Sequence, residues 1–184
     1  MPSALQRSQE MFIRRWGEMA GYWGINRTMA EIHALLYISE RALCMDEIME
    51  RVQISRGSVS MNLRHLMEWD LVRRVHQPAG RKEYFLAETD VWRIFEAITR
   101  HRKRRELEPL IETIRRARDM VKPEMKELSD PQANRARIYR TRLEQMLEFL
   151  ETVSGLFNVV QQLGPARMLL LTKMAGIPTG PDDT

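Results

Sequence analysis

Residues 45–86 read MDEIMERVQISRGSVSMNLRHLMEWDLVRRVHQPAGRKEYFL, and this stretch decides the fold. A short amphipathic helix is expected over residues 46–52. A tight turn follows, in which Ile54 can fill the space between two helices and Ser55 is placed to cap the second helix. That second helix is expected over residues 56–68.

The second helix is predicted to have two different faces. Its apolar residues recur with a 3.6-residue period and should lie in the core; they are Val59, Leu63, Leu66 and Met67. The opposite face carries Ser55 at the start of the helix, followed by Arg56, Gly57, Ser58, Ser60, Met61, Arg64 and His65. Small hydroxyl residues beside arginines allow close approach to base edges and phosphates. We therefore interpret this face as a DNA-recognition surface.

Two β-type runs come next, at 71–75 and 83–86. The intervening HQPAGRK contains a proline and a glycine that favour a turn, and Arg81 and Lys82 place positive charge near its tip. Helix, turn, helix and basic hairpin in this order predict a winged helix-turn-helix. In such a domain the second helix enters a major groove and the wing contacts the backbone or the minor groove.

Local charge agrees with this interpretation. Residues 51–82 contain seven Lys and Arg residues against two acidic ones, although the whole chain carries a net charge of only +4. The attraction for phosphate would therefore come from the distribution of charge. Two alternatives remain: a small helical domain whose arginines are merely solvated, and a winged-helix module that binds a protein partner without binding DNA.

The same residues resemble a known family. GINRTMAEIHALLYIS at 24–39, LCMDEIMERVQISRGSVSMNLRHLMEWDLVRRV at 43–75 and AGRKEYF at 79–85 are similar to the MarR-type winged-helix regulators, and more narrowly to their GbsR-like branch. The resemblance covers about residues 8–122. It departs from the family at Cys44, where Ser or Thr more often caps the helix; Asp46 can serve near the same place.

The resemblance implies a dimeric, ligand-responsive transcription regulator whose recognition helix and wing contact operator DNA. We expect a homodimer that acts as a repressor on a palindromic operator. The physical reason is that one recognition helix touches few base pairs, whereas two copies spaced one helical turn apart multiply the specificity.

The fold class expected is mostly α with a small β wing, in four regions. Residues 1–27 form an N-terminal packing or dimerisation helix and 28–90 the winged domain. Residues 91–128 form a connector helix, and 129–184 a helical dimerisation region with a loose tail. The first helix carries an apolar stripe that should pack on the last helices of the chain or on a second subunit; its members are Leu5, Phe12, Trp16, Met19 and Trp23.

The connector and the last region contain several local signals. Thr89 is expected to cap the connector, and Pro109 to kink or restart it. The basic run 100–105 could contact DNA, but a solvated helix surface is the favoured interpretation. A long helix is expected over 132–163, ending at Gly164 and Pro165. Its 3.5-residue seam predicts side-by-side helices and consists of Tyr139, Leu143, Met146, Leu150, Val153, Phe157 and Val160.

A candidate effector site is made of four aromatic residues, Trp16, Tyr22, Trp23 and Tyr37. Aromatic rings can enclose a quaternary ammonium group such as choline, and the resemblance makes that ligand class worth naming. The spacing does not require such a cage, because Trp16 and Trp23 lie on the apolar stripe, and packing is the favoured interpretation.

The sequence shows no signature of an enzyme. It lacks a Gly-rich phosphate loop, an HExxH motif and paired-cysteine metal spacing, so we expect no catalysis, no metal and no cofactor. The single cysteine, Cys44, is interpreted as a small apolar residue, with an oxidation sensor as the alternative. Without a secretory signal or a membrane-length apolar run, the chain is expected to be cytoplasmic.

Overall fold

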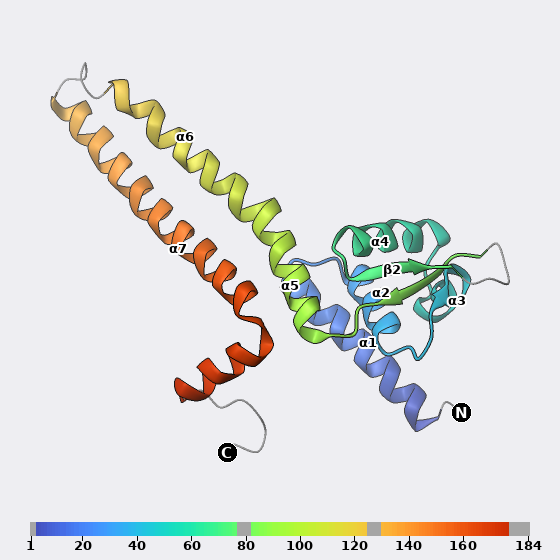
Figure 1. The fold of residues 1–184 in the computed structure, drawn as a ribbon. Coiled ribbons are helices and arrows are strands. Elements are labelled where there is room, and N and C mark those ends of the chain that lie inside the picture. Colours follow the sequence, from blue (N-terminus) through green and yellow to red (C-terminus); the bar gives the residue numbers. More distant parts are fainter. Residues whose placement is uncertain (1–2, 77–81, 125–129, 177–184) are drawn as a thin grey trace. The chain divides into compact units, whose positions relative to one another are not determined.

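The structure is a computed structural model that describes residues 3–76, 82–124 and 130–176. The chain divides into two compact units, residues 1–97 and 98–184, and each is described by itself. The elements shown in Figure 1 are, in chain order, α1 (Ala4–Tyr22), α2 (Arg27–Tyr37), β1 (Leu43–Cys44), α3 (Met45–Val52), α4 (Arg56–Glu68), β2 (Val72–Val75), β3 (Tyr84–Ala87), α5 (Val91–Arg102), the π-helical turn η1 (Lys103–Leu107), α6 (Glu108–Glu124) and α7 (Asp130–Met174). The predicted fold class, mostly α with a small β wing, is confirmed.

The helix-turn-helix forms where the sequence predicts it. Helix α4 has the predicted bounds, and the Ser55 hydroxyl caps it by accepting a hydrogen bond from the Ser58 backbone N–H at 3.3 Å. Its inward residues Val59, Leu63 and Leu66 are buried, and Met67 is half-buried. The core of the first unit forms where these side chains meet α2, which buries Ile32 and Leu36.

The small sheet has three strands in the order β1-β3-β2, with both pairs antiparallel. Strands β2 and β3 form the predicted hairpin, in which Val72 pairs with Ala87 and Val75 with Tyr84. Strand β1 was not predicted, because a two-residue run carries no measurable alternation. It pairs Leu43 with Phe85.

Helix α1 packs on α2 through small residues. Gly17 and Ala20 are buried, and a Cβ added at Gly17 would lie 2.6 Å from Glu31 Cγ, so the Glu31 side chain would have to shift to accommodate it. Further along, the Phe12 ring lies 6.5 Å from that of Tyr37. The predicted apolar stripe is therefore covered only in part by α2, and its members Leu5, Met19 and Trp23 are exposed within the first unit.

The start of α5 corrects one prediction. The cap is Asp90, whose Oδ1 accepts hydrogen bonds from the backbone N–H groups of Trp92 and Arg93 at 2.9 and 3.3 Å. Thr89 instead donates its backbone N–H to Glu88. A carboxylate is favoured at this place because it also interacts with the positive end of the helix.

Near Pro109 the hydrogen-bonding pattern of the helix changes, although α5, η1 and α6 follow one another without an intervening residue. The π-helical turn η1 directly precedes α6, so the backbone hydrogen-bond register shifts just before the residue that cannot donate. In the basic run 100–105, Lys103 Nζ donates a hydrogen bond to Asn158 Oδ1 on α7 at 2.5 Å. The Arg104 and Arg105 side chains are exposed.

In the second unit α6 and α7 lie side by side and run in opposite directions (Figure 1). The prediction that the long helix packs against a neighbour is thus confirmed, but two members of the predicted seam, Tyr139 and Met146, are exposed. Leu147 is 3% exposed, whereas Met146, which the seam predicted to be inward, is 49% exposed. Gly164 interrupts α7 with φ 66° and ψ 171°, at the predicted end of the long helix.

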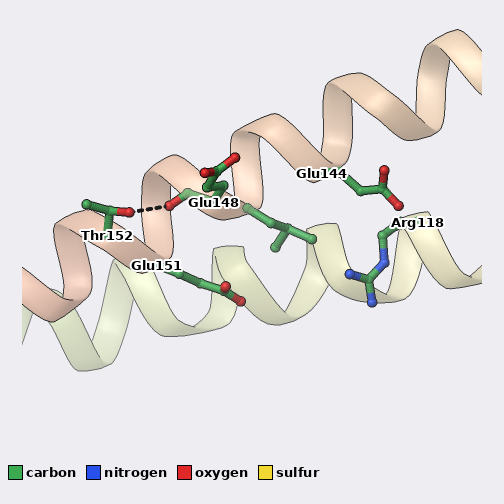
Figure 2. A pocket seen from close by; sticks show the side chains of 6 residues that line it. Arg118, Glu144, Glu148, Glu151 and Thr152 are labelled. Carbon is green, nitrogen blue, oxygen red and sulfur yellow. Dashed lines mark hydrogen bonds between the residues drawn. The ribbon is translucent and has the colours of Figure 1, made fainter.

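Charged side chains border this helical hairpin. Arg115 Nη2 lies 2.6 Å from Glu151 Oε1 and ties α6 to α7. Figure 2 shows an open depression nearby, in which Arg118 lies opposite carboxylates of α7. Among the described residues, no helix is long and apolar enough to cross a membrane.

Candidate nucleic-acid interface

The outward face of α4 is exposed where the sequence predicts contacts. Arg56, Gly57, Met61, Arg64 and His65 are all exposed, and the Met61 side chain is 53% exposed. A methionine so open to water on a helix of only thirteen residues contributes little to the core. The fold itself therefore does not account for this apolar side chain.

Gly57 has no packing role within the first unit. A Cβ added there would meet no atom within 4 Å, and Gly57 adopts no positive φ that would require glycine. Glycine in a helix costs about 0.5–1 kcal/mol relative to alanine. Because glycine has no side chain, another molecule can approach the backbone closely at the start of the helix.

Ser58 and Ser60 of this face are half-buried, whereas Ser55 is exposed. Asn62, which is buried, donates its Nδ2 to the Ser58 backbone oxygen at 2.8 Å and lies 3.4 Å from the Ser58 hydroxyl. Sequence analysis assigned Asn62 to neither face. Its amide holds the first turn of α4 and orients Ser58, while no hydrogen bond to the Ser60 side chain is found among the described residues.

Arg64 carries the least engaged charge on the face. Among the residues that the structure describes, no hydrogen bond or ion pair reaches its guanidinium. The hydrogen-bonding capacity of an arginine is five N–H groups in a fixed fork, suited to a guanine edge or a phosphate. Arg64 is thus exposed and available for an external acceptor.

Arg56 is engaged by Asp46 of α3. The Arg56 Nη2 group pairs with Asp46 Oδ1, and Lys82 Nζ lies 3.2 Å from Asp46 Oδ2. The hydrogen bond from Lys82, together with the charge of Arg56, holds the pKa of Asp46 below its usual value. The site therefore contains an acidic residue, Asp46, that was not among the predicted DNA-binding residues.

The wing is described in part. Lys82 stands just before β3 and is exposed, whereas Arg81 lies outside the described residues. Near the turn end of the hairpin, Arg74 Nη1 on β2 lies 2.5 Å from Oε1 of Glu83, the residue just before β3. Arg73, its neighbour on β2, is exposed.

The start of α3 is held by a second acidic residue. Glu47 accepts hydrogen bonds from the Arg41 guanidinium at 2.5 Å and from the Cys44 backbone N–H at 2.8 Å. The hydrogen bond from Arg41, with a smaller contribution from the Cys44 backbone N–H, lowers the pKa of Glu47 to about 2. Cys44 itself is buried beside β3, where a free cysteine packs as a small apolar residue.

The four candidate effector residues are not gathered into one cage within the first unit. Phe12 joins Trp16 and Tyr37, with ring centroids 5.7 and 6.5 Å away. Tyr22 is 89% exposed, and Trp23 is also exposed. A groove of about 900 Å³ runs between α1, the end of α2 and α3, and none of the four aromatic residues lines it.

His33 is buried between these elements. Its Nε2 has no hydrogen-bond partner among the described residues, and burial lowers its pKa to about 4. The ring lies 6.3 Å from that of Tyr37. Within the described residues no three His, Cys, Asp or Glu side chains are grouped so that they could hold a metal ion.

Comparison with known proteins agrees with this architecture. Residues 23–83, which hold α2, the helix-turn-helix and most of the wing, match the sequence profile of the MarR family. The HTH-type transcriptional repressor GbsR of Bacillus subtilis (strain 168) is 24% identical over 161 residues, 86% of this chain and 89% of that protein. A second protein of that organism, YvaV, is 21% identical over 91 residues, 50% of this chain and 51% of YvaV.

Among solved structures, the chain is similar to MepR, a transcription regulator of the Staphylococcus aureus multidrug efflux pump MepA. The identity is 17% and the TM-score 0.37, over 78% of this chain and 95% of MepR. Residues 23–83 therefore resemble the MarR family, and the chain is similar to GbsR along most of its length.

Proposed function

We propose that this chain is a DNA-binding transcription regulator that acts as a homodimer on a palindromic operator. The observation that carries the proposal is the outward face of α4, where Gly57, Met61 and Arg64 are exposed and Arg64 has no partner among the described residues. In a helix-turn-helix this face enters the major groove. The match to the MarR family supports the same assignment.

The proposed contacts are divided between bases and phosphates. Arg64 and Met61 would lie against base edges, the arginine on a guanine and the methionine on an apolar base surface. Ser55, Arg56, Ser58, Ser60 and His65 would contact base edges or phosphates at the border of the helix, and Gly57 would allow its close approach. Arg81 and Lys82 of the wing would contact the backbone.

Dimerisation is proposed from apolar surface that the second unit does not cover by itself. One face of α7 exposes large apolar side chains at seven- and three-residue steps, namely Tyr139, Met146, Phe149, Leu156 and Val159. A contiguous apolar strip of this kind marks an interaction surface. We assign it to a second copy of the chain, because two recognition helices are needed to read a palindrome.

Repression is the proposed sign of regulation, supported by the similarity to GbsR, a transcriptional repressor. A regulator bound over a promoter excludes other proteins from the same DNA. A small-molecule effector is part of the proposal as well, with Trp16, Tyr22, Trp23 and Tyr37 as its contacts. Tyr22 and Trp23 are exposed within the first unit. An effector bound to them would therefore be enclosed only if residues from outside the first unit covered it.

A gel-shift experiment tests the proposed function. The full chain is titrated against a duplex from the DNA upstream of its own coding sequence, with a shuffled duplex of equal composition as the control. We expect preference for the upstream duplex and an affinity that falls by about 10³-fold or more between 50 and 200 mM salt. Absence of salt-dependent binding would favour the alternative, a winged module for a protein partner.

A further inference from the structure

One carboxylate connects the recognition helix to the wing. Asp46, in the first turn of α3, binds Arg56 through Oδ1 and Lys82 through Oδ2, the latter at 3.2 Å. Arg56 is the first residue of α4, and Lys82 stands just before β3. The three residues are neighbours only in the folded domain, because Asp46 and Lys82 are 36 positions apart in the chain.

The geometry resembles that of a bound phosphate. A phosphate of DNA offers two anionic oxygens, and cationic side chains on a protein surface bind them one or two at a time. Here each carboxylate oxygen holds one cation. All three side chains are exposed to solvent, so they can exchange partners. Exposed ion pairs of this kind are weak and are readily replaced.

We propose that Asp46 limits the affinity of the protein for DNA of any sequence, because it occupies the phosphate position between Arg56 and Lys82 and competes with DNA for these two cations. The inference rests on the proposed DNA-binding function. It assigns to Asp46 a negative contribution to binding that is the same for every sequence. Arg64, which has no partner among the described residues, remains available for a base.

The consequence for affinity follows from counterion release. Affinity for any duplex rises with each phosphate that a protein neutralises, and this part of the affinity carries no sequence information. With Asp46 present, the group of three residues has a net charge of +1 in place of +2. The acid thereby weakens binding to all DNA, and the base contacts supply a larger share of the remaining affinity for an operator.

The test compares wild-type protein with Asp46→Asn, which removes the charge and keeps the shape. Binding of the full chain to the upstream and shuffled duplexes is measured by fluorescence anisotropy at several salt concentrations. We expect the affinity of Asp46→Asn for the shuffled duplex to rise roughly tenfold, with a log–log salt slope steeper by about 2 for a dimer, one phosphate per subunit. Its affinity for the upstream duplex should rise by the same factor, so the ratio of the two affinities should stay unchanged.

Glu50→Gln is the matched control. Glu50 lies on the same helix, is exposed, and lines the groove between α1 and α3. Its replacement changes the net charge equally but frees neither Arg56 nor Lys82, so the affinity should change less than twofold. In an Arg56→Gln/Lys82→Gln background, Asp46→Asn should have no further effect.

Three results would overturn the inference. Equal gains from Asp46→Asn and Glu50→Gln would mean that only net charge matters. A loss of affinity in Asp46→Asn would mean that Asp46 positions the wing for binding. An unchanged effect of Asp46→Asn in the doubly substituted background would show that Arg56 and Lys82 are not involved. A wild-type chain that binds neither duplex would instead contradict the proposed function itself.

Discussion

Arg56 and Arg64 stand on the same exposed face of α4, but their surroundings differ. The helical period places both on the outward face, and this could be predicted from the sequence. That Arg56 shares Asp46 with Lys82 could not be predicted, because the contact joins residues far apart in the chain. Sequence periodicity assigns a side chain to a face and does not identify its partner on another element.

The guanidinium of Arg64, which has no hydrogen bond or ion pair among the described residues, gives the sharpest prediction at the residue scale. Arg64→Ala should leave the unfolding free energy within about 0.5 kcal/mol of wild type, because it removes no such interaction. It should weaken binding to the upstream duplex by about 1–3 kcal/mol if Arg64 reads a base. Arg51→Ala, at an exposed arginine of α3, is the control. Equal effects of the two substitutions in a binding titration would contradict the assignment.

His33 makes stability depend on pH. Its pKa of about 4 in the folded chain lies below its ordinary 6.5, so between these values the unfolded chain binds a proton that the folded chain does not. Stability should therefore fall as pH drops from 6.5 to 4, by as much as about 3 kcal/mol for the full difference in pKa.

Urea unfolding of wild type and His33→Phe at pH 7 and pH 5 measures this contribution. The substitution removes the titrating ring and its buried, unpartnered Nε2. We expect the wild-type chain to lose more stability between the two pH values than the variant does. The same loss in both proteins would show that His33 does not titrate in this window.

At the scale of elements, caps and periodic faces predicted the first unit well. Helix α4 begins after Ser55 as expected, and α2 begins after Asn26, whose Oδ1 accepts from the Met29 N–H at 3.0 Å. Thr89 was the wrong cap because Asp90, one residue later, satisfies two backbone donors. Neighbouring cap residues compete, and their local sequence does not decide between them.

The seam of α7 shows why long helices are harder to predict. Apolar residues at both 146 and 147 allow two overlapping stripes, and a heptad pattern cannot rank them. The structure buries Leu147 against α6 and leaves Met146 on the other face. Packing within the hairpin and the proposed packing between subunits both require apolar residues, which explains why one sequence contains two stripes.

Two glycines of α7 predict opposite stability effects. Gly164 has φ 66° and ψ 171°, a region that side-chain-bearing residues avoid, so Gly164→Ala should destabilise the chain by about 1–3 kcal/mol. Gly155 is helical with no atom within 4 Å of an added Cβ, so Gly155→Ala should stabilise by about 0.5–1 kcal/mol. Urea unfolding followed by circular dichroism compares them, and the same sign for both would contradict the kink at Gly164.

At the scale of the whole molecule, the exposed face of α7 predicts self-association. Phe149 is 62% exposed within the second unit, so Phe149→Glu should preserve helix content while shifting a wild-type dimer toward monomer. Gln145→Glu adds the same charge at an exposed polar position of α7 and should leave the dimer intact. Sedimentation velocity measures the assembly, and a wild-type monomer would contradict the proposal.

The central claim is that the outward face of α4 reads duplex DNA twice in each assembly. Methylation interference on the upstream duplex, with wild type and Arg64→Ala, tests it most directly because it probes guanine N7 in the major groove. The account predicts two sets of interfering guanines, centred about 10 base pairs apart. At one equivalent guanine in each set, methylation should no longer reduce the binding of Arg64→Ala. A single set, or a pattern that Arg64→Ala leaves unchanged, would contradict it.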